Sequence, residues 1–463
     1  HCAESPLTRA DGGSLTMETV RLLAAYVAVA RGQPLSVELR AAASRGVLDL
    51  VAAAAAGIAA PGPRAIRQAA QVTMAPGALP VWFTDQTAGL AGAIWCNASA
   101  AAALDLDDGH RIARGHPGAA VIPAAFAAAQ EVGATTEELL QAIVVGYEVG
   151  VAVGAARRFY ANTAMWSGYG VVAALGLLRG TPPEQLAHAF AIAGMSAPNQ
   201  LHAGAGPAFR AQEGSDVKEG IPWSSVTALN ALLLAEAGHG GPLGLLDNDE
   251  HFRLGGLVEG LGRQGYVARN YMKFHACCRH VHAPVEALLG LIAQHDIDPH
   301  RIEAIEVATY SGALRLANPA RPQGFTDIQF SIPYCLGLVA LDGPEALLPL
   351  TEAAVDRPEV VAMAEKVSLR LDPELDARFP AETLSRVTLR VAGRSYVSPV
   401  TAPRGEASAP PSWEDLEQKL RRASRFVATS GQQAQLLDAL RRLREGDHAP
   451  LLAAFAAVRL SPA

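Results

Sequence analysis

The sequence predicts a mainly α-helical protein in which a large all-helical domain, built from both ends of the chain, carries an inserted, smaller α+β domain. Three observations predict this fold class. Ala- and Leu-rich segments separated by Gly and Pro extend to about residue 260, strand-like alternation follows, and helix-like segments return near the C-terminus. We expect the first part of the helical domain at residues 1–266, the α+β domain at 267–405 and the helical return at 406–463.

The helices are predicted from composition and length. Each Ala- or Leu-rich segment is longer than a typical strand, and both residues favour helix. Thr135 offers a capping hydroxyl before two glutamates, which indicates a helix start. The predicted helical segments are residues 35–60, 119–132, 136–156, 170–178, 183–194, 224–238, 413–429 and 432–444.

The strands are predicted from alternating apolar and polar residues at 301–309, 366–371 and 385–391. A further apolar segment, residues 330–341, lies between the first two, and residues 405–412 (GEASAPPS) indicate a loop.

Composition excludes several classes of protein. Half of the 463 residues are hydrophobic and 18% are charged, which excludes a largely disordered chain. The net charge is −7 without a Lys/Arg run, so we expect no nucleic-acid partner. The apolar run at residues 51–60 is too short to span a bilayer, so we expect no membrane segment. Five cysteines, few and odd in number, predict a reduced, cytoplasmic protein.

The first candidate site follows an Ala-rich run. It contains titratable side chains where a helix should end, and such crowding shifts pKa values apart. The alternative is a solvated loop with an Asp–Asp turn. The cluster consists of Asp105, Asp107, Asp108, His110 and His116.

A second cluster lies at residues 273–282 (KFHACCRHVH). Adjacent cysteines are poor co-ligands and no distant Cys-x-x-Cys exists, so we expect no metal site. These residues could line a polar cleft at the domain junction, or they could simply join the two domains.

Two further positions have equally plain alternatives. Lys218 lies between carboxylates in EGSDVKEGIPWSS, which also fits a salt-bridged helix start with Pro222 in its first turn. Tyr334, in FSIPYC, also fits a core tyrosine. Nucleotide-binding and serine-hydrolase motifs do not occur, which disfavours those enzymes.

Several ordered segments resemble one family. ALDLDDGH…GHPGAAVIPAAFAAAQEVG, KEGIPWSSVTALNALLLAEAG, KFHACCRHVHAPVEALL and FSIPYCLGLVALDG are similar to segments of the MmgE/PrpD family, over about residues 17–460. That family includes 2-methylcitrate dehydratase, cis-aconitate decarboxylase and iminodisuccinate epimerase. The resemblance implies that the α+β domain is a lid, that the protein is a homodimer, and that the active site between the domains needs no metal or other cofactor.

The resemblance also implies site residues. Asp105, His116, Lys273 and Tyr334 match catalytic positions of the family. Two departures stand out: residues 157–170 lack the family's histidine, and the place of an upstream lysine is near Phe209, beside Arg210. The predicted substrate-binding residues are Arg210, Lys218, Cys278, His282 and Tyr160, the last as a substitute for that histidine.

The predicted function is a cofactor-independent lyase of the dehydratase type that moves a proton next to a carbonyl or carboxylate of a small-molecule substrate. His116 would transfer the proton, Asp105 would orient it, Tyr334 would donate to a developing oxyanion or leaving hydroxyl, and Lys273, Lys218 and Arg210 would stabilise negative charge. The Ala/Arg-rich composition suggests secondary metabolism of a high-GC bacterium. The alternatives are an epimerase with two bases, and a non-catalytic ligand-binding or scaffold protein.

Overall fold

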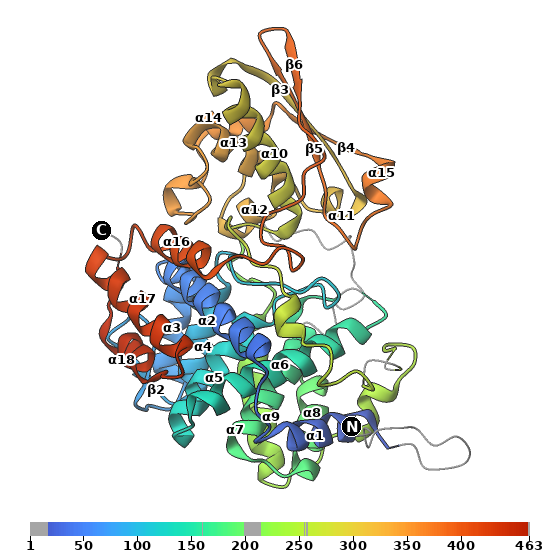
Figure 1. Ribbon diagram of the computed structural model, residues 1–463, viewed down its shortest axis with the longest axis vertical. Coiled ribbons are helices and arrows are strands. Elements are labelled where there is room, and N and C mark those ends of the chain that lie inside the picture. The colour runs from blue at the N-terminus through green and yellow to red at the C-terminus, as the bar shows by residue number, and fades with distance from the viewer. Residues whose placement is uncertain (1–16, 160, 199–213, 254, 256–257, 462–463) are drawn as a thin grey trace.

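The computed structural model describes residues 17–159, 161–198, 214–253, 255 and 258–461. The described chain is mainly helical, as predicted, with two small sheets. In Figure 1 the elements form two masses: helices α1–α9 with the C-terminal helices below, and the four-stranded sheet with its helices above.

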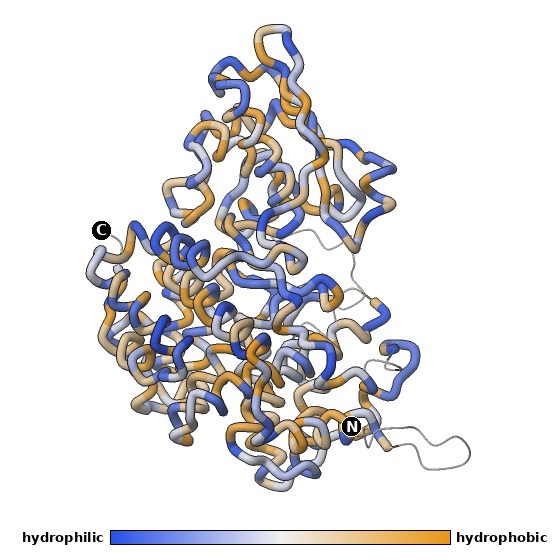
Figure 2. The backbone as a smooth tube through the Cα atoms, viewed as in Figure 1, coloured by the Kyte–Doolittle hydropathy of each residue, from blue (hydrophilic) through white to orange (hydrophobic). Residues whose placement is uncertain are grey.

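Ala-rich helices build the lower mass, because small side chains let them pack closely. Figure 2 shows hydrophobic positions along the helices of this mass, and many of these side chains are buried. The helices are α1 (Thr19–Ala30), α2 (Val37–Gly57), α3 (Pro61–Thr73), α4 (Leu90–Ala102), α5 (Gly118–Val132), α6 (Thr136–Ala156), α7 (Ser167–Arg179), α8 (Pro183–Met195) and α9 (Ile221–Glu236). Two short strands, β1 (Leu79–Pro80) and β2 (Thr87–Ala88), pair beside α4.

Helix α6 is almost entirely buried within this mass. Thr135 caps it through a capping box with Glu138, as the sequence predicts for the helix start. The helix is long and apolar enough to cross a bilayer, but 94% of its apolar window is buried within the protein. That degree of burial is typical of the core helix of a globular domain.

The upper mass contains a sheet with strand order β4-β3-β5-β6. β3 (Ile302–Thr309) runs parallel to β4 (Val367–Leu371) and antiparallel to β5 (Arg386–Val391), which pairs with β6 (Arg394–Val397). The accompanying helices are α10 (Arg279–His295), α11 (Ser311–Leu314), α12 (Phe325–Gln329), α13 (Ile332–Asp342), α14 (Pro358–Ala364) and α15 (Pro373–Asp376).

The chain then returns to the lower mass through α16 (Trp413–Ala423), α17 (Ser430–Arg444) and α18 (Ala449–Ala457). α16 packs on α2, and the two helices are joined by a buried ion pair in which Lys419 Nζ lies 2.6 Å from Asp49 Oδ1. The C-terminal return to the helices therefore occurs, whereas the exact domain boundaries stay a prediction.

The three predicted strands coincide with β3, β4 and β5 within a residue or two, whereas β6 and the two-residue strands β1 and β2 were not predicted. The predicted helix at 413–429 ends earlier, at Ala423, and the apolar segment at 330–341 is the helix α13.

Candidate active site

The loop between α4 and α5, residues 103–117, carries the central carboxylate of the site; we call it the Asp105 loop. Asp105 lies in the left-handed region at φ +50°, and Glu219, just before α9, lies there at +53°. Such a backbone conformation is unfavourable for a residue other than glycine and must be held by its surroundings. Here Lys273 Nζ donates to the Asp105 carbonyl oxygen at 3.0 Å and also contacts Oδ1 of the same residue.

His116 is held in one orientation at the end of this loop. Its Nδ1 lies 2.8 Å from the carbonyl oxygen of Asp108, and its backbone N–H donates to Thr163 Oγ1 at 3.1 Å. A carbonyl oxygen can only accept, so Nδ1 carries the proton and donates it. Nε2 is therefore the basic nitrogen, 3.4 Å from Asp105 Oδ1 and 3.8 Å from Glu219 Oε1.

Two lysines from distant segments meet at Asp105. Lys273, which is fully buried, contacts Oδ1, and Lys218 Nζ lies 3.5 Å from the same oxygen. Lys218 also lies 3.0 Å from Glu219 Oε1. The structure thus brings together Asp105, His116, Lys218 and Lys273 from segments that the sequence analysis treated separately.

The charges in this cluster set its protonation states. Burial lowers the pKa of His116 below 6.5, and the ammonium groups of Lys273 and Lys218 lower it further. Burial alone would raise the pKa of Asp105, but the two lysines outweigh it and hold that pKa below its usual value. At neutral pH the imidazole is neutral, the carboxylate is charged, and the site holds a base next to two cations.

Two carboxylates near His116 were not assigned by the sequence analysis. Glu219 accepts the backbone N–H of Thr163 at 3.1 Å, and although burial opposes its charge, Lys218 lowers its pKa. Asp107 is buried, its carboxylate forms no hydrogen bond with any described residue, and it lies 3.4 Å from His116 Nδ1; burial raises its pKa to about 6. The sequence signal for Asp107 was its place in the first cluster, and the signal for Glu219 was its place next to Lys218.

Asp105, Asp107 and His116 also place ligand-type atoms within 4.8 Å of one another, as in a metal site. The donor set fits a cation poorly, because Lys273 contacts the Asp105 oxygen that would bind it and Lys218 lies close by. Two ammonium groups would repel a metal ion at this place.

The second sequence cluster divides between two environments. Cys278 is the N-cap of α10, and burial raises the pKa of its thiol to about 12, with the charges of Asp105 and Lys273 also acting on it. His282 does not join the His116 cluster: its Nε2 lies 3.2 Å from the carbonyl oxygen of Cys277, and its ring packs against His275. His275 contacts Glu286 at 3.0 Å, and both line a cavity of about 110 Å³ between α10 and α16.

Tyr334 is not brought to the cluster either, which corrects the expectation that it converges with Asp105, His116 and Lys273. Its hydroxyl donates to the carbonyl oxygen of Ala354 at 2.7 Å and accepts the N–H of Arg357 at 3.1 Å. Both capacities of the hydroxyl are used inside the upper mass, where Tyr334 is a core residue of α13.

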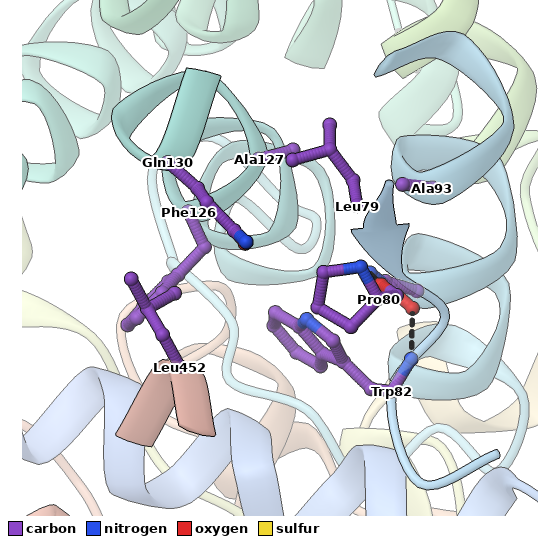
Figure 3. A pocket seen from close by; sticks show the side chains of 9 residues that line it. Leu79, Pro80, Trp82, Ala93, Phe126, Ala127, Gln130 and Leu452 are labelled. Atoms are coloured by element: carbon purple, nitrogen blue, oxygen red, sulfur yellow. Dashed lines mark hydrogen bonds between the residues drawn. The ribbon is translucent and has the colours of Figure 1, made fainter. Parts of the chain in front are cut away.

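Tyr160 and Arg210 lie outside the described residues. Lys218, which the sequence predicts as a substrate-binding residue, supplies a second cation to the cluster beside Lys273. A small cavity near β1, lined by Trp82, Phe126 and Leu452 among others (Figure 3), has a volume of about 10 Å³. That volume holds about one water molecule, so this cavity is too small for a substrate.

Comparisons with known proteins agree with the resemblance. A model of the MmgE/PrpD N-terminal domain matches residues 21–254, and a model of the MmgE/PrpD C-terminal domain matches residues 275–445. Two sequences of cis-aconitate decarboxylase from Aspergillus terreus, one of them from strain NIH 2624 / FGSC A1156, are 27% identical to this chain over 442 residues, covering 88% of it and 89% of each relative. Asp105, His116 and Lys218 lie inside the first matched region, and Lys273 lies just before the second.

Proposed function

Because this chain belongs to the MmgE/PrpD family, whose cis-aconitate decarboxylase is a lyase, we propose that it is a cofactor-independent lyase of the dehydratase type acting on a small carboxylic acid. The family and this relative both support an enzyme of the lyase type.

The observation that carries the proposal is the fixed tautomer of His116. Nδ1–H donates to the Asp108 carbonyl oxygen, so Nε2 presents a lone pair toward Asp105 and Glu219. Burial and the two lysines keep the imidazole neutral at neutral pH, as a general base requires.

In the proposed reaction Nε2 removes the proton on the carbon next to a carbonyl or carboxylate. The electron pair of that C–H bond moves toward the acidic group and then forms the carbon–carbon double bond as hydroxide leaves from the next carbon. Lys218 and Lys273 stabilise the negative charge that develops, and because they are already oriented, little reorganisation is needed.

The proton needed by the leaving group has a source in the same step. Once His116 has accepted the proton, its imidazolium returns it to the departing hydroxide, which leaves as water. Tyr334 was expected to assist here, but its hydroxyl is bonded to Ala354 and Arg357. We therefore assign the acid role to protonated His116.

An epimerase is the second candidate, and one observation favours it. Glu219 Oε1 lies 3.8 Å from His116 Nε2, and Lys218 lowers the pKa of this carboxylate against the effect of burial, so a second base stands beside the first. Two bases can remove a proton and return one without loss of a leaving group.

We also propose that the protein is a cytoplasmic homodimer serving secondary metabolism. The described cysteines are all free thiols, which fits a reducing compartment. Helix α9 leaves Trp223, Leu233 and Leu234 exposed, an apolar surface of the kind that a subunit interface covers.

The test is incubation in D₂O with a panel of small di- and tricarboxylic acids that includes cis-aconitate, followed by mass spectrometry and NMR. A dehydratase releases water from one of them, an epimerase exchanges the proton for deuterium without loss of a group, and a decarboxylase releases CO₂. A protein that does none of these with any acid would contradict the proposed enzyme and support the ligand-binding or scaffold alternative.

A further inference from the structure

Lys419 is a buried cation outside the cluster described above. It lies on α16 and is 1% exposed. Its Nζ donates to Asp49 Oδ1 on α2 at 2.6 Å and to the carbonyl oxygen of Leu106 at 2.8 Å. Leu106 lies between Asp105 and Asp107, so the second contact reaches the Asp105 loop itself.

This contact is one of three that hold backbone carbonyl groups of the Asp105 loop. Lys273 donates a hydrogen bond to the carbonyl oxygen of Asp105, and Lys419 donates one to that of Leu106. His116 Nδ1 donates to the carbonyl oxygen of Asp108. Because neighbouring peptide groups share backbone dihedrals, fixing the Leu106 carbonyl restricts the orientation of the groups on either side. The left-handed backbone of Asp105 needs such restraints.

The pair is costly as a purely structural contact. Both side chains are buried, Asp49 Oδ2 has no hydrogen-bond partner among the described residues, and burial raises the pKa of Asp49 and lowers that of Lys419. Apolar residues at the interface of α2 and α16 would pack without this desolvation, as Leu416 and Leu420 do.

We propose that Lys419 is a positioning residue, which acts from the C-terminal helix α16 through the Leu106 carbonyl to hold the Asp105 loop, and with it His116, in the reactive geometry. The proposal rests on the function proposed for His116. It gives the return of the chain to the lower mass a role in the reaction, since the helix that packs on α2 also orients the site.

The test separates positioning from stability. The double variant D49A/K419M removes both charges, and so leaves no uncompensated ion, while it breaks the contact to Leu106. We expect it to fold and to show a kcat about 10- to 100-fold lower with little change in KM, because a small displacement of reacting groups has effects of this size. The variant D49N keeps Lys419 on Leu106 but leaves its buried ammonium without a charged partner, so it should lower the unfolding temperature while the folded enzyme retains turnover. L420A, on the same buried face of α16, should lower the unfolding temperature without changing kcat in the folded enzyme.

A second measurement needs no substrate. Histidine-selective ¹⁵N NMR, with the His116 signal assigned by H116Q, reports which ring nitrogen carries the proton. The wild type, D49N and L420A should show Nδ1–H, whereas D49A/K419M should show a mixture, because the Asp108 carbonyl moves. If the double variant does not fold, D49N/K419Q takes its place, because it also removes both charges and the shorter Gln side chain cannot keep both contacts of Lys419.

A double variant that keeps both the wild-type kcat and the Nδ1–H signal would overturn the proposal and leave the pair a structural one. If the wild type turns over none of the acids tested, the proposed function fails, but the NMR result still decides whether Lys419 positions His116.

Discussion

Replacement of Asp105 by Asn should destabilise the protein severely, because it removes the carboxylate between two buried lysines. The side chain of Asp105 is 1% exposed and lies 3.5 Å from Lys218 Nζ, with Lys273 in direct contact. At an effective dielectric constant of about 20, two unit charges at that distance interact by roughly 5 kcal/mol. Removing one partner of a buried pair costs about 3–5 kcal/mol in practice, because the other charge stays buried and unpaired.

The assay is urea unfolding at pH 7, followed by tryptophan fluorescence. We expect D105N to lose about 3–5 kcal/mol of unfolding free energy. The matched control is D249N, at an exposed aspartate, which should change the free energy by less than about 0.5 kcal/mol.

The double variant D105N/K273M tests the cause. If the unpaired ammonium causes the loss, the double variant should be less destabilised than the sum of the two single variants, by at least about 1 kcal/mol. Additive costs, or a D105N protein as stable as the wild type, would refute the claim that this carboxylate neutralises the lysines.

Three further predictions follow from the site. As the pH is lowered, kcat/KM should begin to fall only below about pH 6.5, because burial and the lysines lower the pKa of His116 and a general base works only when deprotonated. A loss of kcat/KM that begins above that pH would be inconsistent with His116 as the base. Y334F should lose about 1 kcal/mol of unfolding free energy and keep its turnover, because the Tyr334 hydroxyl hydrogen-bonds only backbone groups of Ala354 and Arg357 among the described residues. A large loss of kcat in the folded variant would instead support the catalytic role that the sequence predicted for Tyr334. Elemental analysis should find no stoichiometric zinc at either His-containing cluster, and activity lost to a chelator would show that a metal binds despite Lys218 and Lys273.

Much of the fold follows from local patterns. Alternation predicts β3, β4 and β5 because one face of each strand packs on the core, and the Ala-rich stretches predict helices because they are too long for strands. The short edge strand β6 has a weaker pattern of alternation, because three of its four residues are exposed and only one is partly buried.

Some residues of the site could likewise be predicted from the sequence, and others could not. Asp105, His116 and Lys273 could be found from residue types and from the resemblance. Tyr334 could not be placed, because a tyrosine on a buried helix gives no sign of which neighbour its hydroxyl meets. Glu219 was missed because its left-handed backbone, which accompanies its contact with Thr163, has no simple sequence signature.

Lys419 had a signal that local patterns can reveal. It lies between Leu416 and Leu420 on the buried face of α16, where a solvated lysine would not be expected. Its partner Leu106 is 313 positions away, so only the folded chain shows what the lysine holds.

The central claim is that His116 Nε2 removes the proton next to the acidic group, and one measurement tests it most directly. Wild-type protein and H116Q are compared in D₂O with an acid that the wild type converts, and deuterium in the recovered substrate and product is followed by NMR. Gln keeps a similar volume and can still bond the Asp108 carbonyl, so the variant should fold, while proton exchange and turnover should both fall at least about 10²-fold. A folded H116Q protein that exchanges the proton at the wild-type rate would contradict the account and place the base elsewhere.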